Sequence, residues 1–223
     1  VDSGLVMAPL ELVLCNSKAG GCGLLQLQHT VSPEFMYRQY WYVSGTNKSM
    51  RDALTDIAVK AKQVVYLKKN DIVLDIGCND GTLLRAYGNK DIRLAGFEPA
   101  SNLQELARKE TTLILNDFFN APTFEKAFPQ EKAKIITSIA MFYDLDTPNN
   151  FVRDIAKILA WNGIWVIQMS YLPFMLDQNA FDNIVHEHLE YYSLGSLEFL
   201  LQRHGMQVVD VETNDVNVGS FRI

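Results

Sequence analysis

The chain between residues 49 and 170 alternates between two patterns of apolar positions. Residues 49–70 repeat apolar side chains three and four positions apart, as on one face of a helix, with Ser49 as the predicted N-cap and Asn70 as the predicted end. Short, almost continuously apolar segments then predict strands at 71–76, 92–97, 112–115, 133–140 and 163–169. The helices predicted between them are 81–87, 101–109 and 150–160. Strands and helices in this order are typical of a parallel sheet with helices on both faces.

Residues 170–192 fit neither pattern and form a predicted insertion. Residues 193–204 return to a helical pattern, which Gly205 ends. Two predicted strands, 206–213 and 216–223, follow with a polar turn between them, as in a hairpin. We therefore predict a Rossmann-like α/β fold, with a mostly parallel seven-stranded sheet, helices on both faces and an antiparallel last strand.

Composition and charge limit the classes of function. The 223 residues are 48% apolar and 21% charged, which suits one large domain at 49–223 after an irregular N-terminal segment at 1–48. The net charge of −6 disfavours nucleic acid as a partner, because nucleic-acid binding needs a basic face. No apolar run approaches the roughly 20 residues that span a bilayer, so we expect no membrane partner.

The cysteines and the ends of the chain add two expectations. Cys15, Cys22 and Cys78 are an odd, sparse set without a secretion signal, which favours a reducing compartment and a cytoplasmic protein. The chain lacks an initiator Met, and its last residues fall inside a predicted strand. We therefore expect it to be a fragment of a longer protein.

The segment 73–81 predicts a ligand site, because an apolar strand leads through a glycine-containing turn into a helix. Glycine lets the backbone approach a ligand closely, and the helix start has free N–H groups. A dinucleotide site would need a further glycine and would place a pyrophosphate beside Asp75 and Asp80. Those carboxylates suit a cation instead, such as S-adenosylmethionine with its sulfonium and ammonium groups. The residues of this turn predicted to bind it are Asp75, Gly77, Asn79 and Gly81.

Two further pieces of this site follow the next two strands. Glu98 and Pro99 come 21 and 22 residues after Gly77, where an acidic side chain can accept both ribose hydroxyls. Asp117 and Phe118 follow the third strand, where a carboxylate can bind the adenine amino group and a ring can pack on the base. Each piece alone is also compatible with a helix cap, but three in this order resemble the class I methyltransferase pattern over residues 71–170. That resemblance implies a class I methyltransferase fold and S-adenosylmethionine-dependent methyl transfer.

The stretch 181–194 contains His186, Glu187 and His188. Histidine suits acid–base chemistry near neutral pH, and a neighbouring carboxylate can stabilise its protonated form. Three interpretations are open at this point. The histidines are satisfied polar groups, or two metal ligands on one face without a further ligand set, or catalytic groups beside the methyl donor.

The same stretch, with similar segments at 22–27, 40–45 and 197–222, resembles the nucleotide-sugar C-methyltransferase family over nearly the whole chain. The resemblance implies that a carbon of a nucleotide-linked 4-keto-deoxysugar is methylated, in deoxysugar biosynthesis. It implies His188 as the general base that removes a proton beside the ketone, with Glu187 and His186 in the same site. Tyr42 and Tyr191 are candidates to donate hydrogen bonds to the sugar or the donor, or are ordinary packing.

The family also has an N-terminal zinc module with two pairs of cysteines. Cys15 and Cys22 match the second pair, widened to six intervening residues, and His29 is a candidate substitute ligand. We expect zinc only if the missing N-terminal ligands are present, and we expect Cys78 to be packing. The resemblance further implies that a C-terminal domain that helps bind the nucleotide-sugar is missing. We expect a monomer or weak homodimer.

Three departures from the family leave the sugar, the methylated carbon and the helper acid open. Val185 stands where some members have Tyr, 141–143 where members often have His, and Val218 where Gly is usual. Two other functions therefore remain: an O- or N-methyltransferase on another small molecule, which needs no carbon-acid base, and a donor-binding module without catalysis. The glycine spacing disfavours a nicotinamide dehydrogenase.

Overall fold

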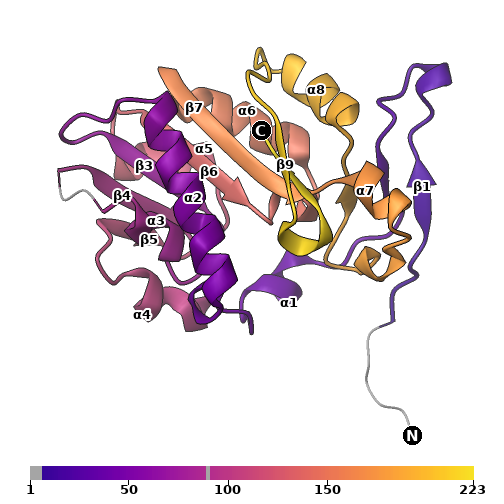
Figure 1. Ribbon diagram of the computed structural model, residues 1–223, viewed down its shortest axis with the longest axis horizontal. Coiled ribbons are helices and arrows are strands. Elements are labelled where there is room, and N and C mark those ends of the chain that lie inside the picture. The colour runs from indigo at the N-terminus through magenta and orange to yellow at the C-terminus, as the bar shows by residue number, and fades with distance from the viewer. Residues whose placement is uncertain (1–6, 89–90) are drawn as a thin grey trace, which may run out of the picture.

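The computed structural model describes residues 7–88 and 91–223. In these residues a seven-stranded sheet has the order β5-β4-β3-β6-β7-β10-β9 (Figure 1). The five strands from β5 to β7 are parallel, whereas β10 is antiparallel to both of its neighbours. The strands are β3 Ile72–Ile76, β4 Arg93–Phe97, β5 Leu113–Leu115, β6 Ala133–Ile139, β7 Leu159–Ser170, β9 Glu212–Asn214 and β10 Ser220–Arg222. The predicted fold class is confirmed, including the antiparallel end.

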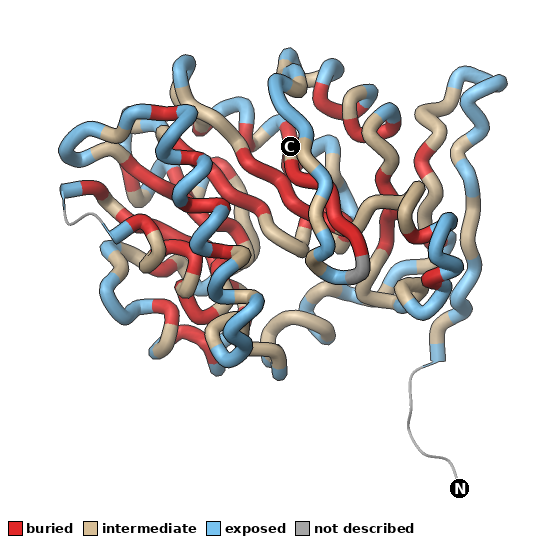
Figure 2. The backbone as a smooth tube through the Cα atoms, in the orientation of Figure 1, coloured by how far each residue is buried: buried red, intermediate tan, exposed pale blue. Residues whose placement is uncertain are grey.

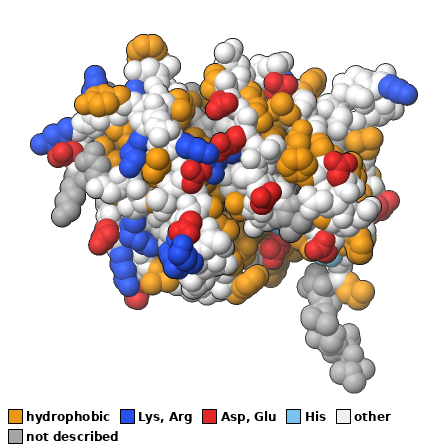
Figure 3. Space-filling view, viewed as in Figure 1, with side chains coloured by type: hydrophobic (Ala, Val, Ile, Leu, Met, Phe, Trp, Pro, Cys, Tyr) orange, Lys and Arg blue, Asp and Glu red, His pale blue; other side chains and the backbone are white. Residues whose placement is uncertain are grey.

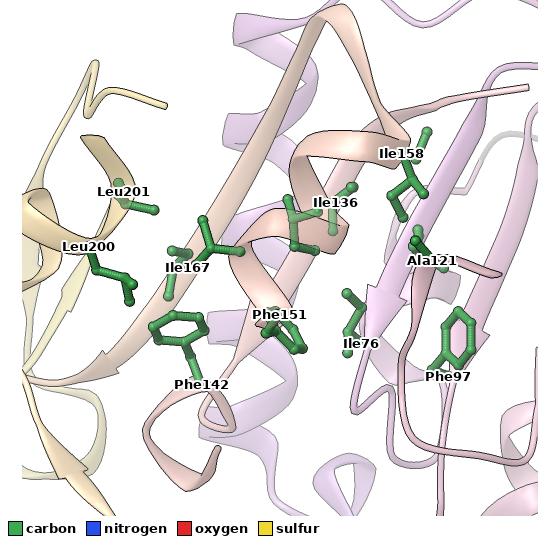
Figure 4. Close-up of a cluster of buried hydrophobic side chains, with 14 of the residues drawn as sticks. Ile76, Phe97, Ala121, Ile136, Phe142, Phe151, Ile158, Ile167, Leu200 and Leu201 are labelled. Carbon is green, nitrogen blue, oxygen red and sulfur yellow. The ribbon is translucent and has the colours of Figure 1, made fainter. Parts of the chain in front are cut away.

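Helices cover both faces of this sheet, because successive residues of a buried strand point to opposite sides. On β3, Leu74 joins a cluster with the helices of one face, while Val73 joins a second cluster with those of the other. Figure 2 shows the central strands β3, β4 and β6 mostly buried, and Figure 4 shows the first cluster, in which Phe142 and Phe151 pack beside Ile167. The first face carries α5 Ala121–Ala127, α6 Pro148–Ile158 and α8 Leu194–Gln202; the second carries α2 Lys48–Val64 and α3 Thr82–Ala86.

The predicted bounds of the first long helix are wrong at both ends. Asn47 is the N-cap of α2, because its side-chain oxygen accepts the Ser49 N–H at 3.0 Å. The helix stops at Val64, since Val65 is already extended, and Asn70 instead adopts a positive φ of 68° in the turn before β3. The strand predicted at 206–213 is also shorter, because its partner β10 offers three residues for pairing.

The N-terminal segment is more regular than its sequence suggests. Two short strands, β1 Leu12–Leu14 and β2 Leu25–Leu27, form an antiparallel three-stranded sheet with β8, Glu190–Tyr191. The first six residues of the segment lie outside the described residues. The helix α1, Pro33–Tyr37, and the loop after it then cross to the carboxyl edge of the main sheet (Figure 1). The other α-helices of the described residues are α4 Gln104–Ala107 and α7 Leu172–Asp177.

The distribution of charged side chains and the hydropathy of the helices follow from the folded structure. On the face in Figure 3, Lys and Arg side chains lie interspersed with Asp and Glu rather than gathered into a basic patch. Among the described residues, no helix is both long and apolar enough to cross a membrane.

Candidate active site

A cavity of about 690 Å³ opens at the carboxyl ends of the parallel strands β3 to β6. Its volume lies within the range of small-molecule sites. Gly81, predicted to bind the donor, does not line it: this residue has a φ of 79°, and a Cβ there would meet the Ala107 carbonyl oxygen at 2.9 Å. Gly81 therefore serves the packing of α3 against α4. The cavity brings together the other predicted donor residues: Tyr42, Asp75, Gly77, Asn79, Glu98, Pro99, Asp117 and Phe118.

The turn after β3 is built for close approach of a ligand. Gly77 has a φ of 72°, a conformation that side chains with a Cβ rarely adopt. Its N–H and that of Cys78 donate to the Phe97 carbonyl oxygen at 2.9 and 3.0 Å, which ties the turn to the end of β4. Asn79 also has a positive φ, 51°, which asparagine tolerates better than most residues. The turn thus holds a left-handed conformation at two of three successive positions.

Glu98 fits the role of a ribose acceptor. Its Oε2 accepts the Asn79 N–H at 2.7 Å, and its Oε1 accepts the Ala100 N–H at 2.8 Å. A carboxylate oxygen has two lone pairs, so each oxygen retains capacity for one hydroxyl. Burial raises the pKa of Glu98 to about 7, although both backbone hydrogen bonds lower it. The carboxylate is therefore oriented by the protein before any ligand binds.

Asp75 is the second buried carboxyl of the donor end. Its Oδ1 accepts a hydrogen bond from the Thr137 hydroxyl at 2.6 Å, which fixes the side chain between β3 and β6. Burial and, less strongly, the charge of Glu98 raise its pKa to about 7, although the hydrogen bond from Thr137 lowers it. Two buried acids that have no cation partner among the described residues suit a ligand that brings positive charge. The residues present therefore fit S-adenosylmethionine.

The predicted adenine site is partly covered by Arg38. The guanidinium lies 4.7 Å from the centroid of the Phe118 ring, and its Nη2 contacts Asp117 Oδ1 at 3.1 Å. Asp117 Oδ1 also accepts the N–H of Phe118 at 2.9 Å. An adenine ring that packs on Phe118 would therefore share this ring with Arg38, and the roles of Asp117 and Phe118 stay a prediction.

A strap, residues 38–46, closes one side of the donor site. The Asn79 amide bridges to it, since Nδ2 donates to the Tyr42 carbonyl oxygen at 3.0 Å and Oδ1 accepts the Ser44 N–H at 2.9 Å. The Gly45 N–H donates to Asp80 Oδ2 at 3.1 Å. Tyr42 therefore lies at the donor end of the cavity. The side chain of Asn79 binds the strap, which sequence reasoning did not anticipate.

The four predicted catalytic residues lie apart from the large cavity. His188 and Tyr191 line a second, much smaller cavity of about 10 Å³, and neither they nor His186 and Glu187 line the large one. Tyr143 lines both cavities and separates them. His186 makes its contact elsewhere, with Nε2 3.0 Å from the Ala8 carbonyl oxygen.

The hydrogen bonding of His188 nevertheless suits a general base. Its Nδ1 lies 2.9 Å from the Asn183 carbonyl oxygen. Because a carbonyl oxygen only accepts, Nδ1 carries the proton and Nε2 keeps the lone pair in the neutral ring. Burial lowers the pKa of His188, while the Asn183 carbonyl and the charge of Glu187 raise it. The imidazole is thus neutral, and able to accept a proton, at neutral pH.

Three residues on the cavity wall were missed as candidates. Tyr37, Tyr143 and Asp144 all line the cavity, and Asp144 has a buried Oδ1 without a hydrogen-bond partner among the described residues. Tyr143 and Asp144 belong to the short helix η4, Phe142–Asp144, directly after β6. The rule that ligands bind at the carboxyl ends of strands would have found them, had it been applied to this fourth strand as well.

The cysteines form no metal centre in the described part of the chain. The Cys22 N–H points to Cys15 Sγ at 3.3 Å, but no group of three or more metal-binding side chains occurs among the described residues. His29 faces Glu11 instead, with Nε2 3.6 Å from Oε2. A zinc site is therefore not supported. Cys78 is buried against β4, where a Cβ on Gly96 would lie 2.6 Å from its Sγ, so its predicted packing role is confirmed.

Comparison with known proteins decides the family. A family model described as a methyltransferase domain matches residues 42–211. The chain belongs to this methyltransferase family. It is a class I S-adenosylmethionine-dependent methyltransferase domain, in line with the sheet order and the donor cavity. It is also 30% identical over 219 residues to the C-methyltransferase NovU of Streptomyces niveus. The aligned region covers 98% of this chain and 51% of that protein. The methyltransferase chain thus spans about half the length of this curated relative.

Solved structures support the fold of this methyltransferase domain. The cyclopropane synthase MmaA2 of Mycobacterium tuberculosis superposes with a TM-score of 0.57 at 18% identity, over 82% of this chain and 74% of that one. An S-adenosylmethionine-dependent methyltransferase of Archaeoglobus fulgidus gives a TM-score of 0.56 at 17% identity, over 73% and 72% of the two chains. At these identities the likeness concerns the fold alone.

Proposed function

We propose that this domain methylates a carbon atom of a nucleotide-linked 4-keto-deoxysugar. The observation that carries the proposal is the 30% identity to a C-methyltransferase along 98% of the chain. The His-Glu-His stretch lies beside the cavity wall, where Leu189 N–H donates to the Tyr143 carbonyl oxygen at 3.0 Å. As part of the same proposal, a further domain helps to bind the nucleotide of the acceptor.

The donor end of the cavity is assigned to S-adenosylmethionine. Asp75 and Glu98 would face its charged and hydroxyl groups, while the turn at Gly77 admits it close to the backbone. When bound, it supplies an electrophilic methyl group, whose bond to sulfur breaks as the bond to the acceptor carbon forms. The strap and the turn hold the donor in one orientation, which lowers the entropic part of the barrier.

His188 is the proposed base. Its Nε2 accepts the proton from the carbon beside the ketone, and the resulting positive ring is stabilised by Glu187. Tyr191 shares the carbonyl that orients His188, since its hydroxyl lies 3.5 Å from the Asn183 carbonyl oxygen. Because Tyr143 separates His188 from the large cavity, the proposal requires this ring to turn aside when the acceptor binds.

The position of His188 also favours a second candidate, O- or N-methyl transfer to another small molecule. That reaction needs no carbon-acid base, so a histidine outside the large cavity is compatible with it. The two candidates differ in what they expect of the His188→Asn variant.

The test has two stages. Calorimetric titration with S-adenosylhomocysteine should show one saturable site, and Asp75→Ala and Glu98→Ala should each weaken it by about 10- to 100-fold, because each removes a hydrogen-bonding charged group. Keto-sugar nucleotides are then screened for methylation with the wild type and His188→Asn. Loss of methylation with unchanged S-adenosylhomocysteine affinity supports C-methylation. Full activity of His188→Asn would favour the second candidate, and absence of binding to folded protein would refute the donor site.

A further inference from the structure

The wall of the cavity beyond the donor residues is a cluster of hydroxyl and carboxyl groups. Tyr37 comes from α1, and Tyr143 and Asp144 come from η4. The Tyr37 hydroxyl donates to the Glu187 carbonyl oxygen at 3.3 Å, and the Leu189 N–H donates to the Tyr143 carbonyl oxygen at 3.0 Å. The cluster is therefore held between α1 and the His-Glu-His stretch, at the carboxyl edge of the sheet.

The groups that face Asp144 carry no positive charge. The groups that act on its carboxyl are Glu187, Tyr37 and Glu190. Among the described residues that line the cavity, the basic one is Arg153, whose Nε lies 3.5 Å from Asp154 Oδ1. A buried carboxylate in such surroundings is unfavourable, so the neutral acid is the stable form.

The pKa directions agree with this geometry. Burial, followed by the charge of Glu187, raises the pKa of Asp144 well above its usual range, and the neighbouring Tyr37 offsets only part of the rise. Burial likewise raises the pKa of Tyr143 well above its ordinary value. Both side chains therefore keep their protons at neutral pH, and each has an O–H group to donate.

Each of the two side chains nevertheless has an oxygen without a hydrogen-bond partner among the described residues. Asp144 Oδ1 is buried without a hydrogen bond, and the Tyr143 hydroxyl makes none to any residue that the structure describes. An oxygen enclosed without a donor is tolerated better as the carbonyl oxygen of a neutral acid than as half of a carboxylate. The proton then resides on the other oxygen of Asp144, on a residue of the cavity wall.

We propose that Tyr143 and Asp144 form the hydrogen-bond donor site for the carbonyl oxygen of the acceptor, with Tyr37 as the residue that positions Asp144. The inference rests on the proposed function and names the residues that assist the base. When the base takes the proton from carbon, the C–H electron pair forms a C=C bond and the carbonyl π pair moves onto oxygen. The two O–H groups stabilise that negative oxygen without giving up their protons, and the C=O bond returns as the new C–C bond forms.

Infrared spectroscopy tests the donor site without turnover. The full-length protein is saturated with S-adenosylhomocysteine, and a keto-sugar nucleotide labelled with carbon-13 at the ketone is added. We expect the ketone stretch to shift to lower frequency on binding, with the shift reduced in Tyr143→Phe and in Asp144→Leu and retained in Asp144→Asn, whose amide still donates. In wild-type-minus-variant difference spectra, Asp144→Asn should remove one neutral-acid carbonyl band from those of the other buried acids, whereas the exposed control Asp177→Asn should remove none.

Kinetics give the second readout. Tyr143→Phe and Asp144→Leu should each lower kcat by about 10²–10³-fold, as loss of one such donor does, while S-adenosylhomocysteine affinity is unchanged. Asp144→Asn keeps the size of the side chain, so its stronger activity separates hydrogen bonding from a folding defect. A bound ketone whose stretch is the same in water, wild type and variants would overturn the inference. A shifted ketone without any methylation would instead support the donor site and contradict the proposed function.

Discussion

Tyr143 and His188 meet edge to face, with their ring centroids 4.6 Å apart and their planes inclined at 72°. The tyrosine is the common wall of the large cavity and of the small one that holds His188. The main-chain hydrogen bond from Leu189 to the Tyr143 carbonyl oxygen fixes the backbone around this contact but leaves the ring bonded to neither side. Access to His188 from the large cavity therefore depends on the side chain of Tyr143.

Shortening Tyr143 should expose His188. In Tyr143→Leu the aromatic wall is lost, so we expect faster modification of His188 by diethyl pyrocarbonate, followed by peptide mass spectrometry. The half-buried residue His204, whose ring contacts Asn149 and not Tyr143, serves as an internal control within the same spectra. Equal rates for His188 in both proteins would show that Tyr143 does not control access.

The ionisation of His188 predicts a pH dependence of stability. Burial lowers its pKa, so protonation is less favourable in the folded state than in the unfolded state. This group therefore contributes stability above the unfolded pKa of about 6.5, and the contribution is lost as the pH falls toward the folded value. Urea unfolding of the wild type and of His188→Gln at several pH values measures it. The difference between the two free energies of unfolding should change between about pH 7 and pH 5; a constant difference would contradict the prediction.

Asp75 and Glu98 predict a pH dependence of stability with the opposite sign to that of His188. Burial raises the pKa of each to about 7, so the stability of the ligand-free protein is highest below their unfolded pKa values and is lost as the pH rises through about 7. A cationic ligand should lower both pKa values and release protons. Calorimetry of S-adenosylmethionine binding near pH 7, in buffers of different ionisation enthalpy, measures that release. Glu98→Gln should reduce it, and a wild type that takes up protons instead would argue against a cation beside these acids.

The hydrogen bonds of the Asn79 side chain are expected to hold the strap, residues 38–46, in place. Asn79→Gly keeps the positive φ but removes the amide that binds Tyr42 and Ser44, so two hydrogen bonds of about 0.5–1.5 kcal/mol each are lost. We expect faster hydrogen exchange at the amides of Ser44 and Gly45, with α2 unaffected beyond its first turn. Asn102→Ala, which frees the strap at Tyr40 instead, is the matched comparison. Unchanged exchange in Asn79→Gly would mean that the strap is held by its other contacts.

Helices and strands were predictable from the sequence where the pattern of apolar residues is contained within the element itself. The spacing of apolar residues located all five parallel strands, because buried strands need side chains that pack on both faces. The residues that cap and end elements were less accessible: Asn47 replaced Ser49 as N-cap because its side chain reached the free N–H. The strands β1 and β2 were missed, since β2 is paired with Glu190 and Tyr191, far along the chain, and such pairing leaves little trace in a short segment.

The sequence alone determined the sheet, the donor turn at Gly77 and the acid at Glu98, since a strand, its turn and the next strand end are linked by short stretches of chain. Only the tertiary structure decided which side chains share the cavity. It placed Tyr37, Tyr143 and Asp144 on the wall, set His188 behind Tyr143, and gave the Asn79 amide to the strap. These contacts join segments separated by 35 to 150 residues. They depend on how whole elements pack, which no local pattern of residues records.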